Sequence, residues 1–122
     1  VVCDDIRHES SGKTVLIGVY NQNILFEDFP AIFSFQIWIQ VKTEGKGKAS
    51  IGIRFKRDKK EIALGNTEIP FNTKDKRITA FAIASPVFNF KKPCELDFDL
   101  KLPGKRWKTI KVIDIEKNKT SP

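Results

Sequence analysis

Apolar and polar residues alternate along several segments of the chain, most clearly at residues 33–41, Phe-Ser-Phe-Gln-Ile-Trp-Ile-Gln-Val. Side chains of an extended strand point alternately to its two faces, so this pattern gathers most of the apolar side chains on one face. The alternation returns at residues 49–55 and 94–100, and turns containing glycine or proline separate the segments. The pattern predicts an all-β fold, a two-layer antiparallel β-sandwich of immunoglobulin-like or C2-like type.

The clearest hairpin is predicted between residues 33–43 and residues 48–57, with a loop at residues 45–47, Gly-Lys-Gly. This register brings the isoleucines and phenylalanines of both strands to one face of the hairpin. On the other face it sets Trp38 opposite Arg54. An aromatic side chain would then lie beside a cation on a polar sheet surface.

A second hairpin is predicted within residues 94–115, around a Pro-Gly turn. Its register sets Phe98 opposite Ile110 and Leu96 opposite Val112, with these side chains inside. The resulting core prediction comprises Phe35, Ile37, Ile39, Ile51, Ile53, Phe55, Leu96, Phe98 and Leu100.

Weaker patterns complete the expected fold. Residues 1–7 and 14–20 predict a hairpin joined by a polar turn. Residues 21–30 show no clean period and end on a proline, which predicts an irregular crossover between the layers. Residues 69–71, Ile-Pro-Phe, predict an edge segment at best, because proline cannot donate to a sheet ladder.

The chain has 122 residues, which suits a single domain, and we expect that domain to span residues 1–116 with a frayed tail at 117–122. No apolar run approaches the ~20 residues of a membrane helix. Because the sequence begins at Val1 and contains no methionine, we expect that preceding residues have been removed. A lost signal peptide, and with it an exported form, therefore stays open.

The formal net charge of +7 is unevenly distributed. Residues 1–47 carry four Lys/Arg against six Asp/Glu, whereas residues 48–122 carry eighteen against nine. A basic surface favours phosphate, nucleic acid or an acidic protein as a partner. Exposed lysines also keep sheet edges from aggregating, which is the structural alternative.

The two cysteines, Cys3 and Cys94, are too few for a disulfide framework, and we predict two reduced thiols. The single histidine, His8, has an odd separation from Cys3, so the two side chains point to opposite faces of a strand. This geometry argues against a nucleophile–base pair. One histidine and two distant cysteines also cannot form a zinc site of usual spacing. We predict no enzyme activity, no metal and no cofactor.

Acidic residues occur in two pairs. Asp4 or Asp5 shares a face with apolar residues of the first strand, so one of these carboxylates needs a partner, such as Arg7 or turn amides. A binding role and a structural role for this pair both stay open. Asp97 and Asp99 share a strand face, and we expect solvated charges that face Lys111.

The aromatic and basic residues of the predicted hairpin at residues 33–57 suggest a recognition surface. Trp38, Arg54 and Lys56 would lie together on a face where folding alone does not require tryptophan, as on platforms that anchor a partner chain or stack bases. The alternative is a tryptophan packed under arginine by a cation–π contact, or covered by a loop. Trp107 would extend this surface or cap one end of the sandwich.

The opening Cys3-Asp4-Asp5-Ile6-Arg7, Gly12-Lys13 and the run Leu-Ile-Gly-Val-Tyr at residues 16–20 resemble an uncharacterised family of small bacterial proteins. The resemblance implies a cytoplasmic bacterial origin and no known activity. It marks Asp4, Asp5, Arg7 and Lys13 as residues to test.

Three functions compete. The leading hypothesis is a non-enzymatic sandwich that binds a protein partner or self-associates through an exposed sheet face or edge. The second is a module that binds nucleic acid or an anionic surface through the basic second part of the chain. The third is an enzyme that uses Asp4, Asp5 and His8.

Overall fold

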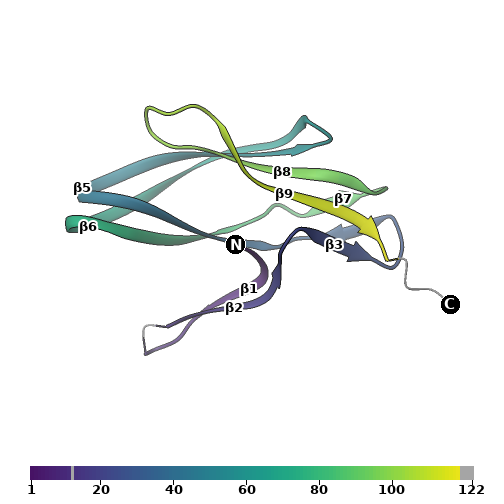
Figure 1. The fold of residues 1–122 in the computed structure, drawn as a ribbon, viewed down its shortest axis with the longest axis horizontal. Coiled ribbons are helices and arrows are strands. Elements are labelled where there is room, and N and C mark those ends of the chain that lie inside the picture. The colour runs from purple at the N-terminus through teal and green to yellow at the C-terminus, as the bar shows by residue number, and fades with distance from the viewer. Residues whose placement is uncertain (12, 119–122) are drawn as a thin grey trace.

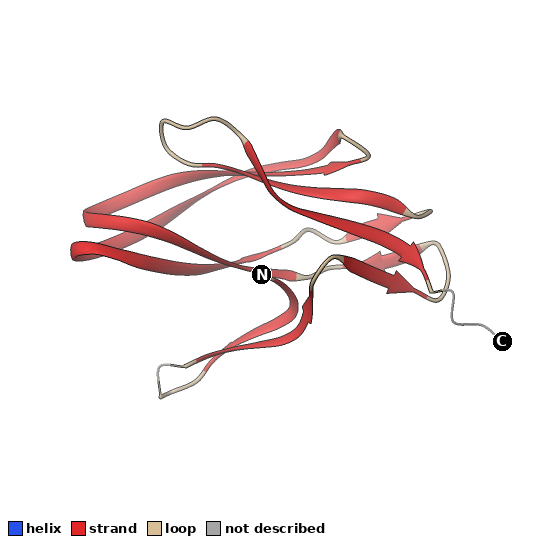
Figure 2. Cartoon of the chain, viewed as in Figure 1, coloured by secondary structure: helices blue, strands red, loops and turns tan. Residues whose placement is uncertain are grey.

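The computed structural model describes residues 1–11 and 13–118, without the side chains of residues 43–46 and 71–80. Strands fill most of this described part, which contains no helix (Figure 2). The all-β prediction is confirmed. The strands are β1 Val2–His8, β2 Thr14–Tyr20, β3 Asn23–Phe26, β4 Ala31–Phe33, β5 Gln36–Arg57, β6 Lys60–Ala84, β7 Phe88–Phe90, β8 Cys94–Lys101 and β9 Lys108–Lys117.

The main sheet has the strand order β2-β1-β5-β8-β9-β3, and β6 pairs with β5 on the other side. β4 and β7 form a separate antiparallel pair. Pairing in the main sheet is antiparallel except between β3 and β9, which run parallel. The purely antiparallel prediction is therefore wrong at this pair. β3 arises within the segment predicted as an irregular crossover, which is a second correction.

The predicted hairpin at residues 33–57 is wrong, because β5 continues through residues 45–47 and pairs with β6 there. A register shift between Thr43 and Gly45 marks a bulge, and glycine in a strand allows a sharp bend. β5 and β6 run together to one end of the molecule, fold back, and continue in the other layer (Figure 1). The sandwich is thus one bent sheet, and its layers are joined by two long strands.

The core lies between the two halves of β5. Ile37 and Ile39 from the first half and Ile51 and Phe55 from the second half are buried. This explains why sequence alternation predicted the core correctly although the pairing was wrong. The buried members of the predicted core are Phe35, Ile37, Ile39, Ile51, Phe55, Leu96, Phe98 and Leu100, whereas Ile53 is partly buried.

The hairpin of β8 and β9 contains a bulge that shifts its register. Leu100 pairs with Lys108 as predicted near the turn, but Phe98 pairs with Lys111 rather than Ile110. Ile110 is the extra residue of this bulge, and it is exposed. Val112 is exposed as well, so the prediction that Ile110 and Val112 lie inside is wrong. The buried residues of β9 are Ile113 and Ile115.

The hairpin predicted near the N-terminus is present, whereas the C-terminal tail begins later than predicted. β1 and β2 pair as predicted, with Cys3 opposite Val19. Lys117 still belongs to β9, and the Asn118 N–H donates to the Phe26 carbonyl. The rest of the predicted tail, residues 119–122, lies outside the described residues. Within the described part, no helix is long and apolar enough to cross a membrane.

Candidate functional site

Asp4, at the predicted signature, lies against β2. Its carboxylate accepts a hydrogen bond from the Tyr20 hydroxyl, at 2.5 Å. Burial of the phenol and this neighbouring carboxylate raise the pKa of Tyr20 to about 12. Gly18, which lies opposite Asp4 in the β1–β2 register, has φ +67°, and a Cβ there would clash with an Asp4 carboxylate oxygen. The absence of a side chain at Gly18 therefore leaves room for the Asp4 carboxylate, which holds β1 to β2 through Tyr20.

Replacing Gly18 with alanine is expected to lower the free energy of unfolding by about 1–2 kcal/mol, because alanine is strained at positive φ and its Cβ meets Asp4. Urea unfolding measures this change. The same substitution in an Asp4→Ala background should cost less, since the clash with the carboxyl group is gone, while the backbone strain and a tight 3.1 Å contact with the Cβ at position 4 remain. Equal costs in both backgrounds would contradict the contact.

Asp5 and Arg7 of the signature contact each other near the protein surface. The Asp5 carboxylate accepts a hydrogen bond from the Ile6 N–H at 2.9 Å and lies 3.4 Å from the Arg7 side chain. Lys13 is exposed in the β1–β2 turn. His8 lies outside the core, whereas Cys3 is buried within it. The structural alternative for this segment accounts for each of these contacts.

Trp38 and Arg54 do not share a surface. Trp38 pairs with Ala82 and Arg54 pairs with Leu64, so the predicted juxtaposition is wrong. Even-numbered residues of β5 point away from the core, and the bend puts its two halves in opposite layers (Figure 1). Trp38 therefore lies on one outer face, with its ring 6.1 Å from that of His8. Arg54 lies on the opposite outer face.

Arg54 and Lys56 belong to an ion network around two buried carboxylates. Asp99 accepts hydrogen bonds from Arg54 at 2.8 Å and from Thr109 at 2.6 Å, and Lys56 lies 3.2 Å away. Asp97 is held by Lys59 at 3.0 Å, while its Oδ1 atom has no hydrogen-bond partner in the described chain. Both carboxylates are essentially unexposed, so the prediction of solvated charges facing Lys111 is wrong.

Trp107 provides the aromatic contact that was expected of Trp38. The Arg54 guanidinium lies 4.4 Å from the centre of the Trp107 ring, within cation–π range. Gly52 makes this approach possible, since a Cβ there would come within 2.9 Å of the indole. The indole therefore covers the network on its solvent side.

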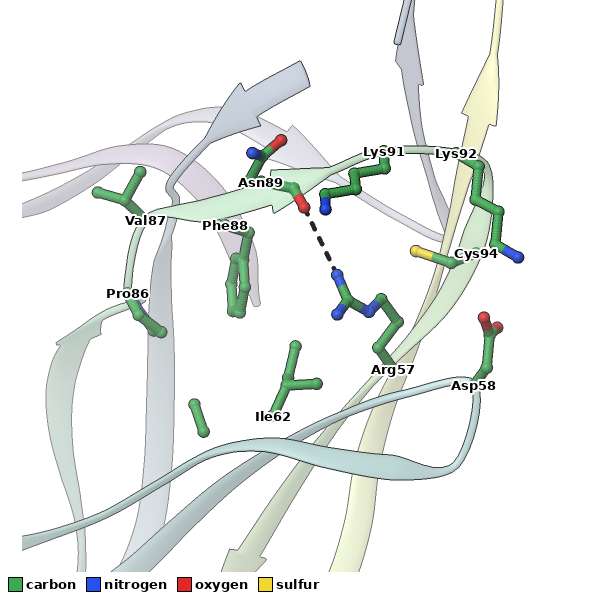
Figure 3. Close-up of a pocket in the computed structure, with 11 residues that line it drawn as sticks. Arg57, Asp58, Ile62, Pro86, Val87, Phe88, Asn89, Lys91, Lys92 and Cys94 are labelled. Atoms are coloured by element: carbon green, nitrogen blue, oxygen red, sulfur yellow. Dashed lines mark hydrogen bonds between the residues drawn. The ribbon is translucent and has the colours of Figure 1, made fainter. Parts of the chain in front are cut away.

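A cavity of about 660 Å³ opens between the β5–β6 turn and the segment before β8 (Figure 3). We call it the end cavity. One part of its wall is apolar and the other carries cations, and Arg57 donates to the Asn89 carbonyl at 3.5 Å. Its lining residues are Arg57, Asp58, Ile62, Ala63, Pro86, Val87, Phe88, Asn89, Lys91, Lys92 and Cys94.

Both cysteines are free thiols. Burial and the charge of Asp58 raise the pKa of Cys94, although Arg57 and Lys92 act in the opposite direction. Burial also raises the pKa of Cys3. A raised pKa disfavours the thiolate, which is the nucleophilic form, so Cys94 contributes a weakly polar wall to the end cavity.

A second concavity, of about 580 Å³, lies between the layers, and we call it the interlayer groove. Its floor is apolar and four cations stand along its rim. The floor contains Ile37, Ile39, Val41, Phe98, Leu100, Leu102 and Ile110, with Val1 and Val2 at one end. The remaining lining residues are Trp38, Gln40, Lys105, Arg106, Lys108 and Lys111.

No group of three or more metal-ligating side chains occurs in the part of the chain that the structure describes. The linings of the end cavity and the interlayer groove combine apolar side chains with cations, which suits binding through charge and apolar contact.

The sequence matches the model of a family of unknown function, DUF6941, over residues 1–113. The chain belongs to the DUF6941 family. This confirms the prediction of an uncharacterised family and extends the likeness far beyond the signature near the N-terminus. No curated protein and no solved structure matches the DUF6941 chain.

Sequence reasoning missed both concavities of this DUF6941 domain. The groove joins residues of β5, β8 and β9 that depend on the unforeseen bend. One clue to the end cavity was present, because Arg57 continues the inward-facing series of Ile51, Ile53 and Phe55. A cation at an inward position marks the place where the core ends.

Proposed function

We propose that this DUF6941 domain is a non-enzymatic binding module that holds an acidic, extended segment of a protein partner in the interlayer groove. The observation that carries the proposal is an open stretch of the β5 edge beside an apolar floor and a basic rim. Such an edge can accept a further strand through backbone hydrogen bonds, while the floor and rim select its side chains.

The backbone of β5 provides the first support. Trp38 exchanges two hydrogen bonds with Val1, at 2.7 and 2.8 Å, so its N–H and C=O point toward β1. Backbone direction alternates along a strand, and Gln40 therefore points its own N–H and C=O to this side. β8 begins to cover this edge only at Gly52. In the described registers no strand lies beside Gln40 there.

Charge provides the second support. The described lining of the groove includes Lys105, Arg106, Lys108 and Lys111 and no carboxylate. By contrast, Arg54 and Lys56 in the second half of β5 are already paired with the buried Asp99. Part of the basic surplus of residues 48–122 is therefore available at the groove. An incoming strand with acidic residues on its outer face and apolar residues toward the floor would match both features.

A short peptide in which valine alternates with glutamate is expected to bind, and its affinity should fall as salt rises. Fluorescence of Trp38, measured in a Trp107→Phe background, reports binding. The same peptide N-methylated on alternate residues should not bind, since it cannot form the ladder. A counterpart with lysine in place of glutamate should also fail.

Gln40 supplies a matched pair of variants. Gln40→Pro removes the backbone N–H on the open side, whereas Gln40→Ala keeps it. We expect loss of peptide binding only in Gln40→Pro, with both variants folded by circular dichroism. Equal binding by the two variants, or by the N-methylated peptide, would refute strand addition. Dimer formation without peptide binding, measured by sedimentation, would instead favour self-association.

A further inference from the structure

The end cavity presents cations without anionic partners next to an apolar wall. Arg54, Lys56 and Lys59 each lie within 3.7 Å of a carboxylate. Across the described residues, neither Arg57 nor Lys91 has such a partner. The only hydrogen bond of the Arg57 side chain in this part of the chain goes to the Asn89 carbonyl at 3.5 Å. Most of the guanidinium donors therefore stay available.

Arg57 differs from an ordinary surface cation because it lies at an inward-facing position of β5, at the end of the core. Phe55, two residues before it on β5, is buried against Phe88 with ring centres 5.2 Å apart. Arg57 takes the next inward position and so extends from the end of the core into the cavity (Figure 3). Lys91 reaches toward the same space in this view.

Asp58, the one carboxylate in the described lining of the end cavity, has another role. Its Oδ1 accepts a hydrogen bond from the Glu95 N–H at 3.0 Å, and its own N–H donates to the Glu95 carbonyl at 2.9 Å. Asp58 lies on the Cys94 side of the cavity, away from the Arg57 guanidinium (Figure 3). It anchors the β5–β6 turn to β8 and leaves Arg57 unneutralised.

The rest of the wall is apolar. Phe88 is almost fully buried beneath it, while Ile62 and Pro86 line the side nearest β6. Val87 is 71% exposed at the entrance. The volume of about 660 Å³ lies in the range of small-molecule sites. The cavity therefore offers an apolar half and a cationic half to one ligand.

We propose that the end cavity binds a small organic anion, a carboxylate or phosphate attached to an apolar group. Arg57 binds the anionic oxygens through its planar fork of N–H donors, and Lys91 adds a second positive charge. The apolar group lies against Phe88, Ile62 and Pro86. This site shares no lining residue with the interlayer groove, so failure of one proposal leaves the other standing.

The test titrates the protein with phenylacetate, phenyl phosphate and the neutral analogue 2-phenylethanol, followed by amide chemical shifts. We expect saturable shifts confined to residues 57–63 and 86–94 with at least one anion and none with the alcohol. The tighter anion identifies the head group. Equal binding of the alcohol, shifts elsewhere, or no saturable shift with either anion would overturn the proposal.

Variants then assign the roles. Arg57→Gln should weaken binding of the tighter anion by about tenfold or more, as expected for loss of charge-assisted hydrogen bonds. Lys91→Gln should weaken it less. Lys13→Gln, which removes an exposed cation at the β1–β2 turn, is the matched control and should leave binding unchanged. An Arg57→Gln protein that is folded and binds as wild type would exclude the site.

The two thiols provide an independent measurement. Cys94 lines the end cavity, whereas Cys3 is fully buried. Iodoacetamide should therefore modify Cys94 first in the folded protein, and the bound anion should slow that reaction. If a saturating concentration of the anion leaves the rate of Cys94 modification unchanged, the anion does not occupy the cavity.

Discussion

Asp99→Ala is expected to lower the free energy of unfolding by about 3–5 kcal/mol, since removing one partner of a buried ion pair leaves its counter-charges uncompensated. Asp99 is fully buried and contacts Arg54, Lys56 and Thr109. The substitution leaves both cations on this sheet face without the carboxylate that they share.

Urea unfolding at neutral pH measures this loss. Asp28→Ala is the matched control, because Asp28 is highly exposed and its contact with Lys117, at 3.6 Å, lies at the surface. That control should change stability by less than about 1 kcal/mol. A comparably small effect at Asp99 would mean that the network adds nothing to the fold.

The lowered pKa of Asp99 predicts that the protein loses stability in acid. Burial alone would raise the pKa of Asp99, but hydrogen bonds from Thr109, Arg54 and Lys56 outweigh it and hold the pKa below the ordinary value of 3.8. The stabilisation is present above that ordinary value and is lost as the pH falls through the lower folded value. The stability difference between wild type and Asp99→Asn should therefore shrink below about pH 4. A constant difference would contradict the ion network.

Sequence alternation was sufficient to predict the fold class and most of the core. Ile37 and Phe55 face inward whether β5 is a hairpin or one bent strand, because the face of a side chain depends on local alternation. Strand pairing depends on partners far away in the sequence. The pairing of Trp38 with Ala82 could not be predicted from residues near Trp38.

The Gly-Lys-Gly segment at residues 45–47 shows why the bend was missed. Glycines between two alternating segments are typical of hairpin turns, and they equally allow a strand to bend. A turn would pair residues 33–43 with residues 48–57, whereas the bend leaves both free to pair with β6. Only the long alternating segment at residues 60–84 favours the second arrangement, and Pro70 and the charges within the segment obscured that strand.

The candidate sites were harder to predict for the same reason. The predicted surface of Trp38, Arg54 and Lys56 depended on one register, and the bend separates its tryptophan from its cations. Asp97 and Asp99 are buried on an outward face because long cationic side chains and Trp107 cover them. Alternation along a strand predicts that outward-facing residues are exposed to solvent. It does not predict that other side chains on the same face cover them.

Ile113→Ala is expected to lower the free energy of unfolding by about 2–5 kcal/mol, as isoleucine truncations in packed cores do. Ile113 is fully buried, and it faces inward because Ile110 is the extra residue of the β8–β9 bulge. Ile110→Ala is the matched control, since it removes the same atoms from a side chain that is 43% exposed. It should cost less than about 1 kcal/mol. The register predicted from the sequence implies the reverse order, so a larger loss at Ile110 would mean that no bulge shifts β9.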